Sequence, residues 1–421
     1  MVIRAWQAVA WPAALAAFLV QWGLPGQSWL GTGGLSLAAG AAALTLMAGS
    51  ALLGSRWAWV ETAFGGLDRV YAAHKWMGVW ALVLASVHLL FKAGADGWEM
   101  APILQLPGPW TRFVRQASYA ALVGIVVLAL NRNIPYATWR LWHKLSGPLF
   151  LVVVLHALSI KSPIALDSPA GLWLATWALL GAAGALYRLL LYPFLARHAE
   201  YEVVAVEPGA AAAHIQLAPT ARPLQFTPGQ FGFLRLKHEG LREPHPFTIA
   251  SGSGGDGRVD FVVRALGDYT RTLVANVRPG MRADVYAPHG RFTRRAGAAC
   301  EAWIAGGVGI SPFIAWLKDP AREDFDGVTL FYFHTPGREF PAVDVLAGMA
   351  AARGARLVPL AGGAHDPGFA AGLEAMCQRH GASAVDVAFC GPQGLLQVVR
   401  ATLAEHGVPP RNVRHELFEF R

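Results

Sequence analysis

Six long apolar stretches occupy the first 192 residues and constrain the fold more than any other feature of the sequence. Each is close to the about 20 residues that an α-helix needs to cross the hydrocarbon core of a bilayer. The first could also be a signal peptide with Arg4 in its basic region, but Trp6, Trp11 and Pro12 interrupt it, which favours a retained helix. The sequence therefore predicts a six-helix membrane bundle. The stretches lie at about 5–24, 34–53, 72–92, 116–131, 143–160 and 170–192.

The excess of apolar residues is confined to this part of the chain. Over all 421 residues, 54% are hydrophobic and 15% are charged, which is too apolar for an ordinary soluble protein. Fourteen of the 16 tryptophans precede residue 178, whereas the chain after residue 198 has the charge density of a soluble protein. Cys300, Cys377 and Cys390 all lie in that later part. They are too few for a usual iron–sulfur cluster and suit a reducing cytosol.

Basic residues cluster at the ends of the apolar stretches, so the net charge of +8 does not indicate nucleic-acid binding. With a cytoplasmic N-terminus, the cytoplasmic connections carry the larger share of these residues, as the positive-inside rule requires. The sequence predicts a multi-pass protein of a bacterial-type inner (plasma) membrane with both termini in the cytoplasm. The cytoplasmic group is Arg56, Arg69, Arg132, Arg140, Arg188 and Arg197; the opposite group is Lys92, Arg112, Arg115 and Lys161.

The polar half shows two successive patterns. From about residue 199 to 297, alternating runs are separated by Gly/Pro turns, which is typical of a small antiparallel barrel. The expected strands include Tyr201–Val206, Phe231–Leu236 and Val259–Arg264.

From about residue 298, short apolar runs alternate with helical patterns, which favours a parallel α/β domain. The predicted protein is thus a multi-domain membrane protein. It has a six-helix all-α transmembrane bundle at 1–197, an antiparallel β-barrel at 198–297 and an α/β domain at 298–421. Strands of the α/β domain are expected at Trp303–Ala305, Val328–His334, Arg356–Leu360 and Ala384–Cys390.

The membrane half contains only four histidines, two in the third apolar stretch and two in the fifth. His74 and His88 are 14 residues apart, and His143 and His156 are 13 apart, so each pair is separated by roughly 20 Å along a helix. Two adjacent helices would offer two His–His pairs at two depths, each able to hold one haem iron. Hydrogen-bonded contacts between helices are the alternative. Thirteen residues do not return to the same helix face, and Pro148 could distort that helix to compensate.

This pattern resembles the ferric-reductase-like transmembrane family, which includes the NADPH oxidases, and Leu67–Gly78 is similar to the entry of that family's third helix. The resemblance implies that His74 and His143 ligate a cytoplasmic-side haem b, and that His88 and His156 ligate an outer one. Arg69 or Arg56 would pair with haem propionates. The alternative is that both arginines only set the membrane topology, as the positive-inside rule describes. Phe150 would lie between the haems or belong to the core.

His245–Ser251 resembles the flavin-binding strand of ferredoxin–NADP reductase-like proteins, with Pro228–Phe231 and Gly267–Thr270 as companion elements. The resemblance implies an FAD domain, since a strand backbone and the Thr248 hydroxyl can reach the isoalloxazine edge while small polar groups bind the diphosphate. The expected FAD-binding residues are Gln230, His245, Pro246, Phe247, Thr248, Ser251, Gly267, Tyr269 and Thr270.

Ala305–Phe313 follows an expected strand and resembles the nicotinamide-phosphate loop of the same reductases, which implies a Rossmann-like NAD(P) domain. Ser311 is expected to cap the next helix, with Pro312 in its first turn. The preference for NADPH rests on His334, Thr335 and Arg338, with NADH left open. The expected NAD(P)-binding residues are Gly306, Gly307, Gly309, Ile310, Ser311, Pro312, Gly391 and Pro392.

The late segment Phe389–Gln393 and the C-terminal Glu416–Arg421 resemble the elements beside the nicotinamide and flavin. Cys390 would lie near the hydride path, with a buried structural cysteine as the alternative. Glu416 belongs to the C-terminal element, in which Phe418, or else Phe420, would cover the flavin.

The resemblance implies hydride transfer from NAD(P)H to FAD and then single-electron transfer through the two haems to an extracytoplasmic acceptor. The expected acceptor is O2, giving superoxide. A ferric chelate or a redox partner protein is the alternative, and a flavoreductase on a haem-free bundle is a further one. Animal oxidases have a histidine one turn beyond the outer ligand and an arginine on the second helix. In this sequence Lys92 stands where that histidine would be, and the second apolar stretch, 34–53, contains no arginine.

Overall fold

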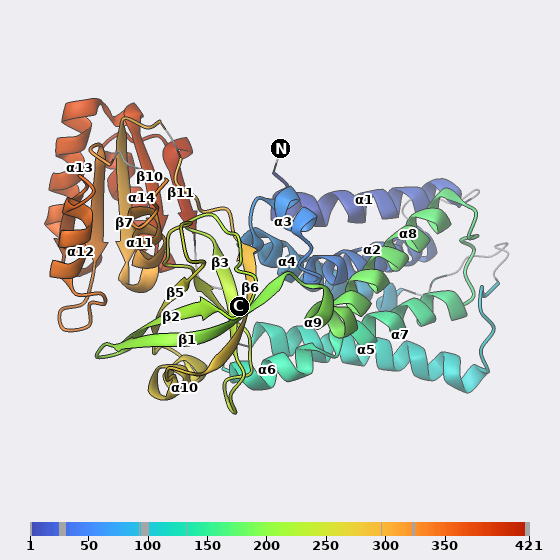
Figure 1. Ribbon diagram of the computed structural model, residues 1–421. Helices are drawn as coiled ribbons and strands as arrows, with labels where there is room; N and C mark the ends of the chain where they lie inside the picture. The colour runs from blue at the N-terminus through green and yellow to red at the C-terminus, as the bar shows by residue number, and fades with distance from the viewer. Residues whose placement is uncertain are drawn as a thin grey trace. The chain divides into compact units, whose positions relative to one another are not determined.

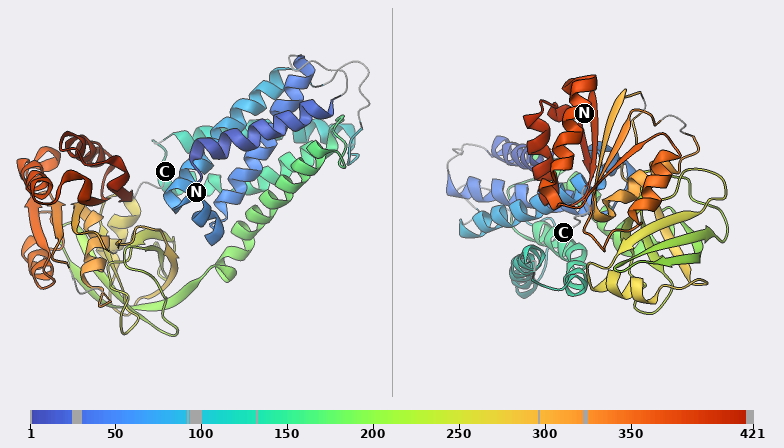
Figure 2. Two further views of the ribbon diagram at one scale, coloured as in Figure 1. Left: turned by 90° about the horizontal axis from the view of Figure 1, so that it is seen from above. Right: turned by 90° about the vertical axis from the view of Figure 1, so that its left-hand side faces the viewer.

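The computed structural model describes residues 2–24, 31–91, 93, 101–131, 133–295, 297–321 and 325–416. The chain forms two compact units, Met1–Ala196 and Arg197–Arg421. The first is helical, and its long helices run side by side (Figures 1 and 2). Its helices are α1 (Ala5–Gly23), α2 (Thr32–Gly54), α3 (Ala58–Phe64), α4 (Leu67–Leu90), α5 (Gly108–Leu130), α6 (Tyr136–His143), α7 (Ser146–Ser159), α8 (Pro169–Leu186) and α9 (Tyr192–Leu195).

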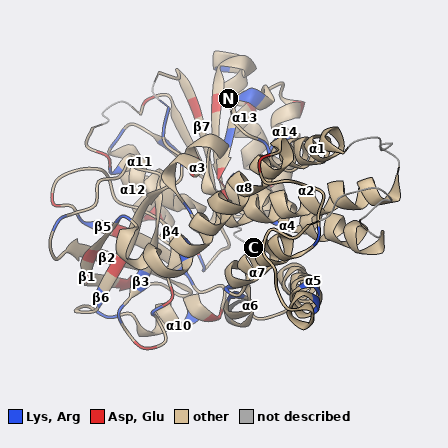
Figure 3. Cartoon of the chain, turned by 90° about the vertical axis from the view of Figure 1, so that its right-hand side faces the viewer, with Lys and Arg blue, Asp and Glu red and all other residues tan. Residues whose placement is uncertain are grey.

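Five spans in the described part of the chain are long and apolar enough to cross a membrane, one fewer than the sequence predicted. They are 32–54, 67–90, 108–130, 138–159 and 169–195. The remaining predicted span, α1, is helical at the expected residues and packs on α2 and α4. It is not among these five spans, because its glutamine, tryptophan and proline residues lower its mean hydropathy. Charged residues are sparse along the long helices (Figure 3).

Helix α2 is the central helix of this unit and packs on α1, α4 and α8. It is built largely from Gly, Ala and Ser, which allow helix backbones to approach closely. At Gly181 of α8, for example, an added Cβ would lie 2.8 Å from the Cα of Ala48. This close packing makes α2 the best-placed helix to contact the histidines of α4.

The fifth apolar stretch is not one straight helix: α6 ends at His143 and α7 begins at Ser146. Pro148 explains the interruption, because it lacks an N–H and its ring clashes with the carbonyl of the residue four positions earlier, Lys144. The expected distortion between His143 and His156 is therefore confirmed.

The second unit begins with an antiparallel sheet in the order β4-β3-β6-β1-β2-β5. A bridge between Ile249, just after β4, and Phe261 of β5 nearly closes this sheet into a barrel. The predicted strands Phe231–Leu236 and Val259–Arg264 are confirmed to the residue. The elements are β1 (His198–Pro208), β2 (Ala212–Pro219), β3 (Phe231–Leu236), β4 (His245–Thr248), β5 (Val259–Arg264), α10 (Asp268–Asn276) and β6 (Arg282–His289).

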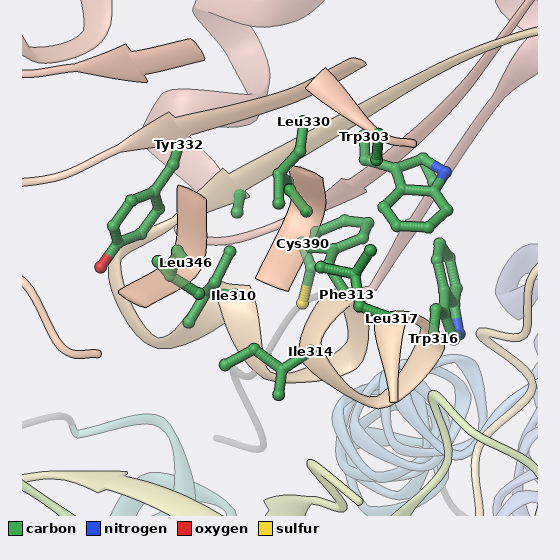
Figure 4. Packing of buried hydrophobic residues seen from close by; sticks show 14 of the residues in the cluster. Trp303, Ile310, Phe313, Ile314, Trp316, Leu317, Leu330, Tyr332, Leu346 and Cys390 are labelled. Atoms are coloured by element: carbon green, nitrogen blue, oxygen red, sulfur yellow. The ribbon is translucent and has the colours of Figure 1, made fainter. Parts of the chain in front are cut away.

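A parallel sheet in the order β11-β10-β7-β8-β9 follows, which confirms the predicted α/β domain. Helices α11 and α12 cover one face, where Cys390 lies among Ile310, Phe313 and Leu330 (Figure 4). Helices α13 and α14 cover the other face. The elements are β7 (Cys300–Gly306), α11 (Ser311–Leu317), β8 (Val328–Phe333), α12 (Val343–Ala351), β9 (Arg356–Leu360), α13 (Pro367–His380), β10 (Val385–Cys390), α14 (Gln393–Glu405) and β11 (Val413–Glu416).

Candidate functional site

The four membrane histidines form two pairs. The ring centroids of His74 on α4 and His143 at the end of α6 are 5.8 Å apart. His156 on α7 lies within electrostatic range of His88 at the other end of α4. Helix α4 packs mainly on α2, and helix α7 packs mainly on α5.

The His74–His143 separation fits two axial ligands of one metal ion. Each nitrogen would lie about 2 Å from the metal, which places two such centroids about 6 Å apart. A Cβ on Gly78, one turn after His74 on α4, would meet no atom within 4 Å. No group of three or more His, Cys, Asp or Glu side chains in the described ranges could hold a metal by itself. A macrocycle such as haem, which leaves only two axial positions to the protein, would fit this two-histidine arrangement.

The sequence analysis missed two serines of α2 that contact the α4 histidines. Nδ1 of His74 lies 2.9 Å from the backbone oxygen of Ser50, and Nδ1 of His88 lies 2.8 Å from that of Ser36. The 14-residue spacing of Ser36 and Ser50 matches that of the histidines and was a usable signal in the sequence.

The two arginines expected at the propionates are placed differently. Arg56 has its guanidinium 5.7 Å from the ring centroid of Tyr71 and 6.0 Å from that of Tyr192. Arg188 lies 4.0 Å from the Tyr192 ring, so two cations meet at the end of the bundle that holds His74. Arg69 is exposed and lies at the α3–α4 turn, near Gly65. The pairing of either arginine with a propionate stays a prediction.

Phe150 is almost fully buried. Its ring lies against Gly181 of α8, where an added Cβ would come within 2.8 Å of it. This contact supports the core interpretation of Phe150, and its position between two haems stays a prediction.

The expected flavin elements converge on the edge formed by β3 and β4. Phe231 pairs with Thr248, and the Ile249 N–H donates to the Gln230 backbone oxygen at 3.0 Å. The Gln230 side-chain amide donates to the Gly290 oxygen at 3.0 Å and so ties this edge to the end of β6. Pro246 and Phe247 are half-buried on β4.

Thr248 has a buried hydroxyl that a bound ligand could satisfy. Its side chain is 4% exposed, and within the described part of the chain its Oγ1 has no hydrogen-bond partner. A buried hydroxyl without a partner is costly, so a bound polar ring edge such as that of a flavin fits this position.

His245 and Tyr269 come from different flavin elements and stack with their ring centroids 3.6 Å apart. Thr270 accepts hydrogen bonds from the N–H groups of Leu266 and Gly267 at 3.0 Å each, so both amides are already used within the turn before α10. Ser251 accepts from the Asp260 N–H at 3.2 Å and lies on the side of the barrel that meets α11. The expected residues thus share one domain but do not all present free polar groups.

The glycine loop after β7 packs directly on the loop after β10. A Cβ at Gly309 would collide with the carbonyl oxygen of Cys390, and one at Gly306 would lie 2.9 Å from Cδ of Pro392. Gly391 is equally tight, with the Gly306 nitrogen 3.1 Å from its added Cβ. Both loops lie at the carboxyl ends of adjacent parallel strands, where open α/β sheets bind their ligands.

The expected capping role of Ser311 was wrong. The residue before α11 is Ile310, which is already helical, because the glycine loop forms a 3₁₀ turn at Gly307–Ile310 that runs into the helix. The Ser311 hydroxyl instead donates to the Val308 oxygen at 2.9 Å. Pro312 does lie in the first turn, as predicted.

Cys390 is fully buried at the end of β10 and pairs in register with Glu416 of β11. Burial, together with the nearby Glu416 carboxylate, raises the pKa of the Cys390 thiol well above its usual value, so it stays neutral at physiological pH. Phe418, Phe420 and Lys92 lie outside the described residues.

A polar cluster that the sequence analysis did not identify connects the two domains of the second unit. The Lys318 Nζ atom lies 2.7 Å from Oδ2 of Asp260, and Nε2 of His214 lies 3.4 Å from the same oxygen. Asp260 is on β5 of the barrel, whereas Lys318 directly follows α11. The cluster therefore fixes the glycine-loop helix relative to the barrel.

Comparison with known families assigns both parts of the chain. Residues 39–154 match the ferric reductase like transmembrane component, and residues 203–291 match an FAD-binding domain. The chain joins a ferric reductase-like membrane domain to an FAD-binding reductase unit. The matched membrane component and the five apolar spans make it a multi-pass membrane protein. Its second unit contains the FAD-binding domain.

Individual relatives match parts of the chain. The probable cell surface ferric reductase kap2 of Aspergillus oryzae is 26% identical over 63% of the chain and 34% of its own length. The ferredoxin reductase component of a 3-ketosteroid-9-alpha-monooxygenase from Mycobacterium tuberculosis is 28% identical over 47% of the chain. That match covers 56% of the relative, so the chain spans between a third and just over half of these proteins.

Among solved structures, the FAD/NAD binding domain of a nitric oxide dioxygenase from Vibrio cholerae is 21% identical. The structural match covers 52% of the present chain and 98% of the Vibrio cholerae domain, with a TM-score of 0.43.

Proposed function

We propose that the protein transfers electrons from cytoplasmic NAD(P)H across the membrane through FAD and two haem b groups to an acceptor on the other side. The observation that supports this most directly is the pairing of His74 with His143 at the separation that axial ligands require. When bound, FAD accepts two electrons and releases them singly, and bis-histidine haem carries one electron at a time.

The chain's own residues would position each group. Thr248 would donate to the flavin edge with its otherwise unpartnered hydroxyl. The glycine loop and Gly391–Pro392 would lie against NAD(P)H, and the neutral Cys390 beside them would exclude water. His74 and His143 would hold the cytoplasmic-side haem, His88 and His156 the outer one, and Arg56 would neutralise a propionate.

The choice of nucleotide has evidence on both sides. His334, Thr335 and Arg338 follow β8, where a 2′-phosphate would be recognised, and favour NADPH. Glu339, however, has Oε2 3.8 Å from Nδ1 of His334. Backbone hydrogen bonds, chiefly from its own N–H, lower its pKa, so a carboxylate stands where it would favour NADH. The ratio of kcat/KM for the two nucleotides decides between them.

The proposed acceptor is O2, giving superoxide. Ferric chelates are the second candidate, favoured by the likeness to the kap2 ferric reductase. If the acceptor is instead a redox partner protein, turnover should be slow with both O2 and ferric chelates.

The test uses the full chain purified in detergent. NADPH and NADH are added separately, and the haem spectrum is recorded with superoxide and ferrous-iron assays in parallel. Reduction of two haems by either nucleotide is the expected result. A preparation that retains FAD but has no Soret absorbance would overturn the proposal.

A further inference from the structure

Helix α2 carries the same short pattern twice. Ser36-Leu-Ala-Ala-Gly40 and Ser50-Ala-Leu-Leu-Gly54 each place a glycine four residues after a serine, on the same side of the helix. The two copies are 14 residues apart, which equals the separation of His74 and His88 on α4. Because α2 and α4 are close neighbours, each copy faces one histidine.

Ser36 and His88 are joined by reciprocal hydrogen bonds. The Ser36 hydroxyl donates to the His88 backbone oxygen at 3.0 Å. Nδ1 of His88 lies 2.8 Å from the Ser36 backbone oxygen and 3.1 Å from its Oγ. A carbonyl oxygen can only accept, so Nδ1 carries the proton.

Ser50 and His74 repeat this arrangement. Nδ1 of His74 lies 2.9 Å from the Ser50 backbone oxygen and 3.0 Å from its Oγ. The Ser50 hydroxyl lies 3.5 Å from the His74 backbone oxygen. With Nδ1 protonated, the Nε2 atom of each α4 histidine keeps its lone pair for a metal.

The opposite histidines lack this support. Within the described residues, Nδ1 of His143 and Nδ1 of His156 are buried without a hydrogen-bond partner. The two members of each histidine pair are therefore held differently: α4 supplies the member with a fixed tautomer and ring orientation.

We propose that Ser36 and Ser50 are positioning residues for the α4 ligands. The backbone oxygen of each serine fixes the tautomer of one histidine. Its hydroxyl oxygen adds a second acceptor for Nδ1–H, which orients the ring and raises the basicity of its Nε2. The proposal rests on the bis-histidine haem sites of the proposed function. A hydrogen bond from Nδ1–H strengthens imidazole as a ligand and stabilises the ferric state. Each serine therefore lowers the midpoint potential of one haem.

Gly40 and Gly54 of α2 differ in how closely a histidine ring of α4 approaches them. A Cβ at Gly40 would lie 2.8 Å from Nδ1 of His88, whereas the nearest atom to a Cβ at Gly54 is Cε1 of His74 at 3.9 Å. Gly40 is thus required for the His88 ring to approach α2, and Gly54 is not required for His74.

The experiment compares Ser36→Ala and Ser50→Ala in the full-length, haem-loaded protein by redox titration and electron paramagnetic resonance. Each variant is expected to keep both haems. Ser36→Ala should raise the midpoint potential of the haem held by His88, and Ser50→Ala should raise that of the haem held by His74. Ser118→Ala on α5 is the control, because this buried serine donates only to Val114 of its own helix. It should shift neither potential.

The glycine variants add an independent comparison. Gly40→Ala is expected to alter the spectrum and potential of the haem shifted by Ser36→Ala, whereas Gly54→Ala leaves both haems unchanged. If the wild type binds two haems but both serine variants keep wild-type potentials and resonance spectra, the positioning role is overturned and the proposed function stands. A wild-type protein without haem overturns the proposed function, and this proposal with it.

Discussion

Lys318 Nζ and Asp260 Oδ2 lie 2.7 Å apart, and this ion pair joins the end of α11 to strand β5 of the barrel. Asp260 is buried and also meets the ring of His214. Nδ1 of His214 in turn lies 3.1 Å from Oε2 of Glu207. The barrel and the nucleotide domain are therefore held together by a cluster of charged groups whose strength depends on pH.

The first prediction concerns the pH dependence of this cluster. Burial opposes protonation of His214, but its hydrogen bonds to Asp260 and Glu207 outweigh burial and raise its pKa above the usual value. A raised folded pKa adds stability that is fully present below the unfolded pKa of about 6.5 and is lost as pH rises through the folded pKa. The temperature at which the reductase unit releases FAD should therefore fall between pH 6 and pH 8.5.

His214→Gln is the matching variant, because glutamine keeps a polar side chain without titrating. It should lower stability at pH 6 by about 1 kcal/mol and flatten the profile in this range. FAD release is followed by flavin fluorescence in the full-length protein. An unchanged slope in His214→Gln would contradict the role assigned to this ring.

A second prediction concerns the contact between Gly309 and Cys390. A Cβ at Gly309 would collide with the Cys390 carbonyl, which belongs to a central strand and cannot move freely. Gly309→Ala should therefore push the two loops apart, cost about 1–3 kcal/mol and slow haem reduction by NAD(P)H on the order of 100-fold. Reduction by dithionite should remain.

Gly394→Ala is the control for that variant, since an added Cβ at Gly394 would meet no atom within 4 Å. It lies in the same region, at the start of α14, and should reduce at the wild-type rate. Equal rates for both variants would show that the glycine loop does not need its close contact.

Local patterns in the sequence were sufficient for most of the second unit. Strand β3 and strand β5 were predicted to the residue, because a short run bounded by Gly/Pro turns is a local signal. The expected alternation is not found in these two strands, since all but one residue of each is buried. The break before α7 was also predictable, since Pro148 affects its own preceding turn.

The features that were missed depend on contacts between distant segments. Ser36 and Ser50 look like ordinary small residues of a packed membrane helix until α4 is placed beside them. The stacking of His245 on Tyr269 likewise joins two motifs whose mutual orientation is set by the barrel. The Ser311 cap was wrong because the preceding glycine turn had already entered a helical conformation.

A third prediction separates flavin binding from stability at Thr248. Its buried Oγ1 has no partner within the described residues, so Thr248→Val removes an unsatisfied hydroxyl with little change in volume. The FAD-free protein should be as stable as wild type or more stable. FAD affinity should fall by about 5- to 10-fold, which corresponds to one lost hydrogen bond of about 1 kcal/mol.

The control for Thr248→Val is Thr272→Val on α10, whose hydroxyl donates to the Asp268 oxygen of its own helix. Thermal unfolding of the FAD-free protein and a flavin fluorescence titration give the two readouts. A variant that loses stability without FAD while keeping its affinity would place the Thr248 hydroxyl in a structural role instead.

The last prediction concerns the pairing of the four histidines. Because His74 lies against His143 and His88 is near His156, the single variants His88→Ala and His156→Ala should each remove the same haem. His74→Ala and His143→Ala should remove the other. The double variant His88→Ala/His156→Ala should then lose no more haem than either single variant, since both changes act on one site. His198→Ala, in the reductase unit, should keep both haems. Haem content per protein decides the matter, and a double variant that still binds two haems would refute the ligand assignment.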